Sequence, residues 1–369
     1  MNAKLWAHIK KDPVLWISGV LAAGTAFLVP PDAGYAGYID LRTLALLFSL
    51  MAVVGALARR GLLDAAAGLF IQKARSVRGL GLLLVLLCYT SAMLITNDVA
   101  LLTFVPLALV LMREDGCAMM VTVILQTAAA NLGSMLTPFG NPQNLYLYTA
   151  YGMTGGEFMK AVLPAGLMAL PLLLALVRLL PRMGLAVRLH VSGPAFQPDA
   201  ATLALAALFL LCVAAVLRLV PWPAAFLCTL AALLLLDRRA LKNVDYALLL
   251  TFCFFFIFVK NLARLEAVKF LLNSLLAGRE LLASALVSQF VSNVPAALML
   301  SGFTDKGSAL VTGTNVGGLG TLIASMASLI SFKLYTRAEG ARPMRYLIWF
   351  SAVNFGLLAV LLAFTLAVN

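Results

Sequence analysis

Charged side chains are scarce in this sequence. Asp, Glu, Lys and Arg make up 11% of its 369 residues, and 63% are hydrophobic, whereas a soluble domain carries roughly 25% charged residues. The chain also lacks a polar stretch long enough to fold as a separate soluble domain. Its apolar runs are mostly about 15–23 residues long, which suits the ~30 Å hydrocarbon core of a lipid bilayer. We therefore expect an all-α polytopic membrane protein.

Histidine and paired cysteines are also nearly absent. The two histidines, His8 and His190, fall in the N-terminal tail and in a loop, which argues against a histidine-based metal centre. The cysteines show no C-x-x-C spacing and are interpreted as small core residues: Cys88, Cys117, Cys212, Cys228 and Cys253. No G-x-x-x-x-G-K-[ST] phosphate-binding loop is present. We expect no ATP hydrolysis on this chain and no cofactor other than a bound Na⁺.

The net charge of +12 has a membrane explanation. Lys and Arg lie in short loops between apolar runs, as the positive-inside rule describes, so we expect no nucleic-acid partner. The basic flank before residues 14–30 and the Arg59-Arg60 pair place the N-terminus in the cytoplasm. We expect a bacterial-type cytoplasmic (inner) membrane protein with its C-terminus outside. A signal peptide over the first apolar run is the alternative.

The apolar runs fall into two halves with the same order of elements. In the first, 1–181, we expect spans at about 14–30, 41–58 and 161–180, a hairpin at 80–112 and a broken helix at 117–151. Residues 182–220 form a linker and connecting span. In the second, 221–369, we expect spans at about 222–236, 245–259 and 346–367, a hairpin at 281–303 and a broken helix at 308–333. Amphipathic segments at 61–77 and 260–277 occupy matching places, and we interpret Lys260 and Arg264 as interfacial snorkelling residues. The order predicts two inverted-topology repeats, each with a re-entrant hairpin.

Polar residues interrupt the apolar pattern at matching places in both halves. Thr96-Asn97-Asp98 and Ser292-Asn293-Val294-Pro295 each form a hairpin tip, and the apolar run after each tip is itself broken, at 137–144 and at 312–318. The glycines at 313, 317, 318 and 320 favour an unwound segment over a close-packing helix face. Irregular backbone persists at membrane depth only where protein or a water-filled cavity covers it. Such paired interruptions indicate a transporter's binding site.

The residue types at these breaks suit ion binding. Helix N-termini favour anions, and helix C-termini and unwound carbonyls favour cations. Asparagine amides and hydroxyls add the oxygen ligands that hard cations take. The alternative is that these residues only cap helices or join them. The candidate substrate- and ion-binding residues are Thr96, Asn97, Asp98, Thr137, Gly140, Asn141, Gln143, Asn144, Ser292, Asn293, Thr312, Thr314, Asn315 and Gly317.

Four stretches resemble the ion transporter superfamily, which holds the arsenite permeases, the D-type bacterial Na⁺/H⁺ antiporters and the citrate and dicarboxylate–sodium symporters. Thr96-Asn97-Asp98-Val99-Ala100-Leu101-Leu102 with Val105-Pro106 resembles an arsenite-permease-like first hairpin. Gly133-Ser134-Met135-Leu136-Thr137-Pro138-Phe139-Gly140-Asn141-Pro142-Gln143-Asn144 resembles the first broken helix. Ser292-Asn293-Val294-Pro295 and Gly313-Thr314-Asn315-Val316-Gly317-Gly318 resemble the second set. The resemblance covers about residues 40–335.

The resemblance implies a secondary active transporter for a small anion or oxyanion, coupled to H⁺ or Na⁺, with elevator-type movement of the hairpins. It implies one Na⁺ at Thr96, Asn97 and Asn141, a second at Ser292, Asn293 and Asn315, and substrate between the tips. Members are often dimers, so a homodimer is a further expectation. Dicarboxylate members carry Ser-Asn-Thr at both tips. Here the third positions are Asp98 and Val294, which favours a neutral or singly charged substrate, such as arsenite as the neutral acid, over citrate or succinate.

Asp98 is the strongest single candidate. Desolvation of a carboxyl group at the midplane favours its protonated form, which suits a proton carrier or a cation ligand. The alternative is that Asp98 N-caps a helix over 99–112. If Asp98 exchanges protons for a cation, the chain is a cation/proton antiporter instead. An intramembrane enzyme and a channel are remoter alternatives. We expect no enzyme, because Ser134 and Ser292 lack an evident His or Lys partner.

Overall fold

The computed structural model describes residues 13–62, 65, 68, 71, 74–184 and 199–368. In these residues the secondary structure is helical, with one isolated β-bridge between Ser76 and Gly184. Six helices are long and apolar enough to cross a membrane. They are α3 (Leu41–Arg59), α5 (Val77–Leu94), α7 (Gly116–Ser134), α9 (Gly155–Val177), α13 (Tyr246–Ala263) and α19 (Pro343–Val368). The prediction of an all-α polytopic membrane protein is confirmed.

Shorter helices fill the places between these six. They are α2 (Pro13–Leu28), α6 (Asn97–Leu111), α8 (Pro142–Ala150), α10 (Ala200–Val216), α11 (Trp222–Leu236), α12 (Arg238–Lys242), α14 (Glu266–Leu276), α15 (Glu280–Val291), α16 (Asn293–Leu300), α17 (Gly307–Val316) and α18 (Met326–Tyr335), with 3₁₀ turns η1 (Ala33–Gly37) and η2 (Leu322–Ala324).

The helices follow one order twice. A long helix, two helices meeting at a polar tip, two helices separated by a break and another long helix appear as α3, α5–α6, α7–α8 and α9, and again as α13, α15–α16, α17–α18 and α19. That the two halves are inverted copies bounded near 181 and 221 stays a prediction. Most of the amphipathic segment at 61–77, and residues 185–198 of the linker, lie outside the described residues.

Two aspartates set the starts of corresponding helices. Asp40 accepts a hydrogen bond from the Thr43 N–H (3.1 Å) and caps α3, and Asp245 accepts one from the Leu248 N–H (3.0 Å) and caps α13. Their backbone angles are nearly equal, with φ −78° and ψ 88° at Asp40 and φ −77° and ψ 84° at Asp245. An aspartate at this position satisfies a free helix N–H and complements the positive end of the helix dipole.

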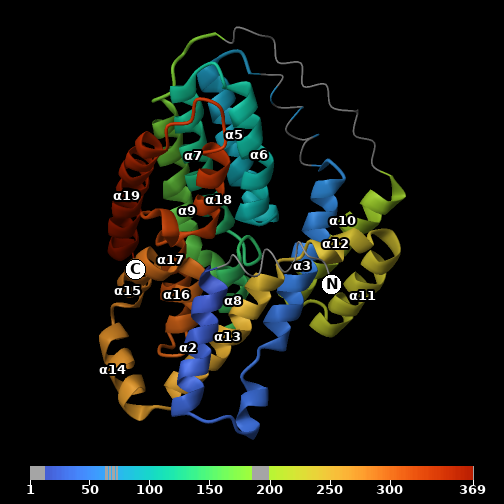
Figure 1. The fold of residues 1–369 in the computed structure, drawn as a ribbon, viewed down its shortest axis with the longest axis vertical. Coiled ribbons are helices and arrows are strands. Elements are labelled where there is room, and N and C mark those ends of the chain that lie inside the picture. The colour runs from blue at the N-terminus through green and yellow to red at the C-terminus, as the bar shows by residue number, and fades with distance from the viewer. Residues whose placement is uncertain are drawn as a thin grey trace.

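Buried apolar side chains form two cores. The first joins α5, α6, α7, the end of α9, α18 and α19. The second joins α3, α8, the start of α9, α10, α11, α13, α16 and the early part of α17. Each broken helix passes between the cores, because α7 and α18 belong to the first while α8 and the start of α17 belong to the second. Figure 1 shows α8, α16 and α17 between the α5–α7 group above and α2 and α13 below. The breaks therefore lie where the two cores meet.

The segment after α13 contains a short helix with exposed apolar side chains. α14 meets α15 at an angle of 109° and exposes Phe270, Leu271 and Leu275, as expected of a helix lying in the membrane interface. Arg264, just before α14, forms an ion pair with Asp32 at 2.8 Å and holds the pKa of that carboxyl below its usual value. The snorkelling interpretation of Arg264 stays a prediction, and the ion pair adds a structural role. Its guanidinium group ties the η1 loop to the end of α13.

Candidate functional site

The first hairpin tip rests on the first break. α5 ends at Leu94 and α6 begins at Asn97. The Asn97 N–H donates to the Gly140 carbonyl at 3.3 Å, and the Thr137 hydroxyl donates to the Met93 carbonyl at 2.6 Å. These bonds satisfy backbone groups that the membrane could not hydrate. The structure thus brings the Thr96–Asn97 tip against the Gly140–Asn141 segment.

The second tip rests on the second break in a related way. Ser292, between α15 and α16, adopts φ +75°, a strained conformation for a residue with a side chain. The Ser292 hydroxyl donates to the Ala324 carbonyl at 3.4 Å. Gln289, one turn earlier on α15, donates from Nε2 to the Gly317 carbonyl at 2.8 Å and to the Leu319 carbonyl at 3.0 Å. The tip is thereby held against both ends of the break.

The second break begins later than the sequence predicts. α17 stays helical to Val316, and the non-α segment runs from Gly317 to Ser325. Gly313 therefore lies within a helix, and the prediction of an unwound segment at that residue is wrong. The reason is close packing: a Cβ on Gly313 would lie 2.0 Å from Ser284 Oγ, and one on Gly317 would lie 2.7 Å from Ala285 Cα. Small residues let α17 and α15 approach.

Asn315 connects the second broken helix to the first. Its Oδ1 accepts from Asn141 Nδ2 at 2.9 Å, and its Nδ2 donates to Asn144 Oδ1 at 2.5 Å. Asn141 Oδ1 in turn accepts from the Asn144 N–H at 2.9 Å, capping α8. All three side chains are buried. Three asparagines from two halves of the chain thus form one closed hydrogen-bonded set, in which a change at one residue leaves its partners unsatisfied.

Asn131 makes the reciprocal connection, and sequence analysis missed it. Its Oδ1 accepts from Asn97 Nδ2 at 3.1 Å and from Ser325 Oγ at 2.9 Å, while its Nδ2 donates to Ser328 Oγ at 3.5 Å. Through Asn131 of α7, the first hairpin tip is therefore joined to the end of the second break. The sequence did contain an indication of this role. Asn131 lies one turn after Thr127, so two polar side chains share one face of an otherwise apolar helix.

Two adjoining cavities lie between the tips. One has a volume of about 510 Å³ and the other about 370 Å³. They share the lining residues Asp98, Leu102, Pro142, Asp245, Leu248 and Ile330. The smaller cavity reaches both tips, since Asn97, Ser292 and Asn293 line it. Seven candidate residues line one or both cavities: Thr96, Asn97, Asp98, Asn141, Gln143, Ser292 and Asn293.

The other seven candidates are absent from these linings within the described part of the chain: Thr137, Gly140, Asn144, Thr312, Thr314, Asn315 and Gly317. The hydroxyls of three of them are engaged elsewhere, and that of Thr137 donates to the Met93 carbonyl. Thr312 donates to the Ala161 carbonyl at 2.8 Å, and Thr314 donates to the Leu310 carbonyl at 2.7 Å. We interpret these seven residues as supports of the tips and breaks rather than as direct ligands.

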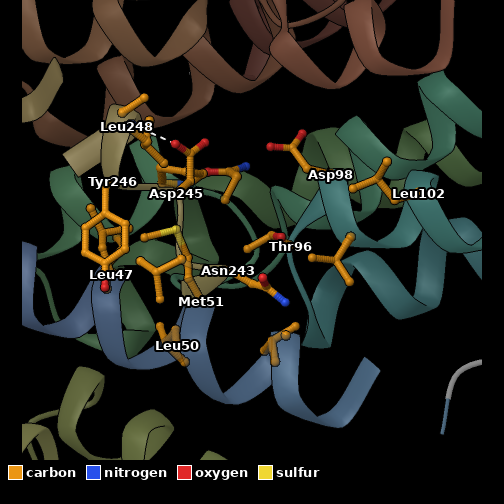
Figure 2. Close-up of a pocket in the computed structure, with 18 of the residues that line it drawn as sticks. Leu47, Leu50, Met51, Thr96, Asp98, Leu102, Asn243, Asp245, Tyr246 and Leu248 are labelled. Atoms are coloured by element: carbon orange, nitrogen blue, oxygen red, sulfur yellow. Dashed lines mark hydrogen bonds between the residues drawn. The ribbon is translucent and has the colours of Figure 1, made fainter. Parts of the chain in front are cut away.

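Two carboxyl groups line both cavities. Figure 2 shows the carboxyl group of Asp98, on α6, directed toward Asp245, whose own carboxyl group accepts the Leu248 N–H at the start of α13. α6 begins at Asn97 with Thr96 at the N-cap position, so the N-cap interpretation of Asp98 is wrong. Asp98 Oδ1 is buried and has no hydrogen-bond partner among the described residues. Asp245 was not a candidate, because the sequence shows only an acidic residue beside a basic cluster and not the direction of its side chain.

Comparisons with known proteins assign the chain to a family. A family model described as citrate transporter matches residues 6–305. The chain belongs to the citrate transporter family. Inner membrane protein YbiR of Escherichia coli (strain K12) is 30% identical over 357 residues, covering 93% of this chain and 94% of that protein. An uncharacterized transporter of Methanocaldococcus jannaschii is 30% identical over 301 residues, covering 80% and 81%.

A shorter similarity links this member of the citrate transporter family to silicon efflux transporter LSI3 of Oryza sativa subsp. japonica. It amounts to 30% identity over 138 residues, 37% of this chain and 28% of that protein. These relatives are consistent with the superfamily that the tip and break motifs resemble. The chain is thus a multi-pass membrane transporter and not an enzyme.

Three basic side chains also line the cavities of this transporter. Lys242, at the end of α12, lines the larger cavity, and Lys333 and Arg337, at and just beyond the end of α18, line the smaller one. The salt bridges recorded in the described residues involve other cations, namely Arg59, Arg60 and Arg264. The cavity walls therefore combine three cations that form no salt bridge with a described residue and the two carboxyl groups. In the sequence, the Lys and Arg residues of the loops indicated only the orientation of the chain in the membrane.

Proposed function

We propose that this family member is a secondary active transporter that carries a small anion or oxyanion across the cytoplasmic membrane, coupled to Na⁺ or H⁺. The observation that carries the proposal is the cavity whose wall holds both polar tips. Residues far apart in sequence converge there, and each tip is fixed by its own break. Binding at the meeting point of broken helices is the arrangement by which secondary transporters hold ions and substrate together.

The first Na⁺ site is proposed at Thr96, Asn97 and Asn141, which lie on or beside the first tip. The second is proposed at Ser292 and Asn293. Asn315 was expected in the second site, but its bonds to Asn141 and Asn144 favour a role behind the first. Amide, hydroxyl and backbone carbonyl oxygens are suitable ligands for a hard cation.

Elevator-type alternating access is supported by the packing. α13 packs on α2, and α3 packs on α10 and α11. The hairpins pack mainly on the broken helices, α5 and α6 against α7, and α15 and α16 against α17, while α16 also touches α13. The cavity lies between these groups, since Asp98 comes from a hairpin and Asp245 from the start of α13. Movement of the hairpin group past α13 would expose the cavity to each side of the membrane in turn.

A small oxyanion, or its neutral acid, suits the tips better than citrate. Asp98 places a carboxyl group beside the proposed site, and Val294 offers no hydrogen bond. Both features disfavour a polycarboxylate. A relative named as a silicon efflux transporter matches part of this chain, and that similarity supports a small substrate over citrate. A homodimer, a cytoplasmic N-terminus and an external C-terminus stay predictions.

A cation/proton antiporter is the second candidate, and Asp98 Oδ1 favours it, because this buried atom has no hydrogen-bond partner in the part of the chain that the structure describes. A buried, unpaired acidic group within a membrane transporter is a suitable place for a proton to exchange with a cation. In that case Asp98 itself is the exchanging group and the cavity needs no anion.

Thermal unfolding of the purified protein in detergent tests the proposal. We expect Na⁺, but not K⁺, to raise the melting temperature by several degrees, because an ion at ~100 times its Kd stabilises the folded state by about 2.7 kcal/mol. Asn97→Ala and Asn293→Ala should each weaken this response, and a transported anion should add to it in the wild type. Asn354→Ala, which alters a buried asparagine of α19 bonded to the Phe350 carbonyl of its own helix, should keep it.

The pH response separates the two candidates. The alternative result is a melting temperature that is independent of Na⁺ but dependent on pH, with the pH dependence lost in Asp98→Asn. That result would contradict the sodium-coupled permease and support the antiporter. Indifference to Na⁺, pH and every anion tested would contradict both.

A further inference from the structure

Two arginines from distant parts of the chain lie close together where α3 begins and α10 ends. Arg42 is the second residue of α3, and Arg218 is the second residue after α10. The two helices pack against each other, and the two positive charges are near enough to repel. The ion pairs recorded in the described residues involve other arginines. The fold thus brings together two like charges that no carboxylate in the described part of the chain pairs with.

Arg42 presents a hydrogen-bond donor that is shielded from solvent. Its Nε is buried and has no hydrogen-bond partner within the described ranges. A guanidinium group stays charged in proteins and offers only donors. A buried donor without a partner lowers stability, so a ligand with acceptor oxygens is favoured at this atom.

Arg218 is held in a fixed position beside it. Its Nη1 donates to the Gly152 carbonyl at 2.9 Å, and its guanidinium carbon lies 5.7 Å from the centroid of the Tyr148 ring. Its backbone adopts φ +63°, which is strained for a residue with a side chain. These contacts fix the direction of the Arg218 side chain, so it forms a preorganised partner for Arg42.

The acidic side chains near the two arginines are already engaged in helix caps. Asp40 accepts the Thr43 N–H at 3.1 Å and the Thr43 hydroxyl at 2.5 Å. Glu157 accepts the Thr154 N–H at 2.7 Å and the Thr154 hydroxyl at 2.9 Å. Both carboxylates act on the arginines through their charge, but neither forms a recorded ion pair with them. The guanidinium groups therefore remain suited to an external anion.

The surroundings of the pair are apolar and exposed. Leu41, just before Arg42, is 64% exposed, and Leu219, just after Arg218, is 76% exposed. Trp222 begins α11 three residues later, and tryptophan is enriched where membrane helices meet water. Ends of apolar helices lie at the level of the lipid head groups. Charge and exposed apolar surface thus occur together where a phospholipid offers both a phosphate group and acyl chains.

We propose that Arg42 and Arg218 bind the phosphate group of an anionic membrane lipid. The planar, fixed fork of an arginine matches two phosphate oxygens, and a negatively charged lipid is attracted by both arginines. Leu41 and Leu219 contact the acyl chains. The bound phosphate offsets the repulsion between the arginines and holds the start of α3 against the end of α10. This inference goes beyond the proposed transport and does not rest on it.

Lipid-dependent thermal unfolding tests the site. Phosphatidylglycerol and phosphatidylcholine with the same acyl chains are titrated into the purified full-length protein in detergent. Phosphatidylglycerol should raise the melting temperature at a concentration about tenfold lower than phosphatidylcholine, because its net negative charge is attracted by both arginines. Inorganic phosphate, which has no acyl chains, should not reproduce the shift. This arm of the experiment distinguishes a lipid from a free oxyanion.

Arg42→Gln is the decisive variant. It should weaken the response to phosphatidylglycerol about tenfold or more, because hydrogen bonds to a charged group are lost. Without lipid it should melt no lower than the wild type, since the repulsion between the arginines is relieved. Arg42→Lys keeps the charge but not the fork, and should lose less; it carries the test if Arg42→Gln does not fold. Arg113→Gln is the matched control, because Arg113 is an exposed arginine just beyond the end of α6, and it should respond as the wild type does.

Each other result would overturn the proposal. Equal responses to the two lipids, or a phosphatidylglycerol response that the Arg42 variants leave intact, would show that the arginines bind no anionic lipid. An equal loss in Arg113→Gln would show a general effect of charge. A shift produced by inorganic phosphate alone and lost in Arg42→Gln would assign the pair to a free oxyanion. Since these measurements involve neither Na⁺ nor transport, their failure would leave the proposed function standing.

Discussion

Asn315→Ala is expected to weaken Na⁺ binding roughly 10- to 100-fold, although Asn315 lines neither cavity. Its side chain donates to Asn144 Oδ1 and accepts from Asn141 Nδ2, and so holds the proposed ligand Asn141 in place. Loss of a residue that orients a metal ligand commonly costs a factor of that size. The substitution also leaves Asn144 Oδ1 without this partner, and we expect the free energy of unfolding to fall by about 2–4 kcal/mol. Sodium titration followed by thermal unfolding measures both effects.

Asn354→Ala again provides the comparison. Asn354 is as deeply buried as Asn315, but among the described residues its side chain donates to the Phe350 carbonyl of its own helix. Its loss should leave sodium affinity unchanged. If Asn315→Ala and Asn354→Ala lowered sodium affinity equally, or if neither did, the connection between the two breaks would have no part in ion binding.

Gly317→Ala is expected to abolish the sodium response by displacing the second hairpin. A Cβ at this position would lie 2.7 Å from Ala285 Cα and 2.9 Å from the Ala285 carbonyl oxygen. Both are backbone atoms of α15, so no side-chain rotation relieves the clash, and α15 must move away from the second break. Overpacking of this kind costs about 1–3 kcal/mol, and because α15 leads directly into Ser292 and Asn293, the tip moves with it.

Gly356→Ala on α19 is the control for this variant, since a Cβ there meets no atom within 4 Å. It should change stability by no more than about 1 kcal/mol and in the stabilising direction, because alanine is the better helix former. Retention of full sodium-dependent stabilisation by Gly317→Ala would mean that the second tip tolerates displacement and that the proposed second site is wrong.

The fold class could be predicted from the sequence because its high hydrophobic content indicates that the chain is surrounded by lipid. Long apolar runs between basic loops can form little else than membrane helices. The tips at Asn97 and Asn293 were also located correctly between helix pairs. Three consecutive polar residues in the middle of an apolar segment are too deep to face water and too polar to face lipid. They therefore mark the place where the helix ends.

The second break shows where a local pattern misleads. Glycine weakens a helix, and this property predicted unwinding at Gly313. Yet glycine also removes the side chain that would keep two helices apart, and in α17 that second property prevails because α15 packs directly against it. The choice depends on the neighbour, which the sequence around Gly313 does not contain.

Asp245, Asn131 and Lys333 were missed as site residues for a related reason. Each has an ordinary local explanation, as a helix cap, a polar contact between helices and a basic flank of the membrane. Only the tertiary structure places Asp245 and Lys333 in the cavity wall and brings Asn131 between Asn97 and Ser325. The functional meaning of such residues lies in contacts between segments that are up to about 200 positions apart.

The central claim is that the cavity between the tips couples an ion gradient to anion transport. Its most direct test is uptake of labelled phosphate, arsenite and citrate into proteoliposomes under an imposed Na⁺ gradient, an imposed pH gradient, or neither. We predict that at least one small oxyanion accumulates above its equilibrium level only when a gradient is present, and that Asn97→Ala and Asn293→Ala abolish this accumulation. Uptake that merely equilibrates regardless of either gradient, or that both variants leave intact, would contradict the account.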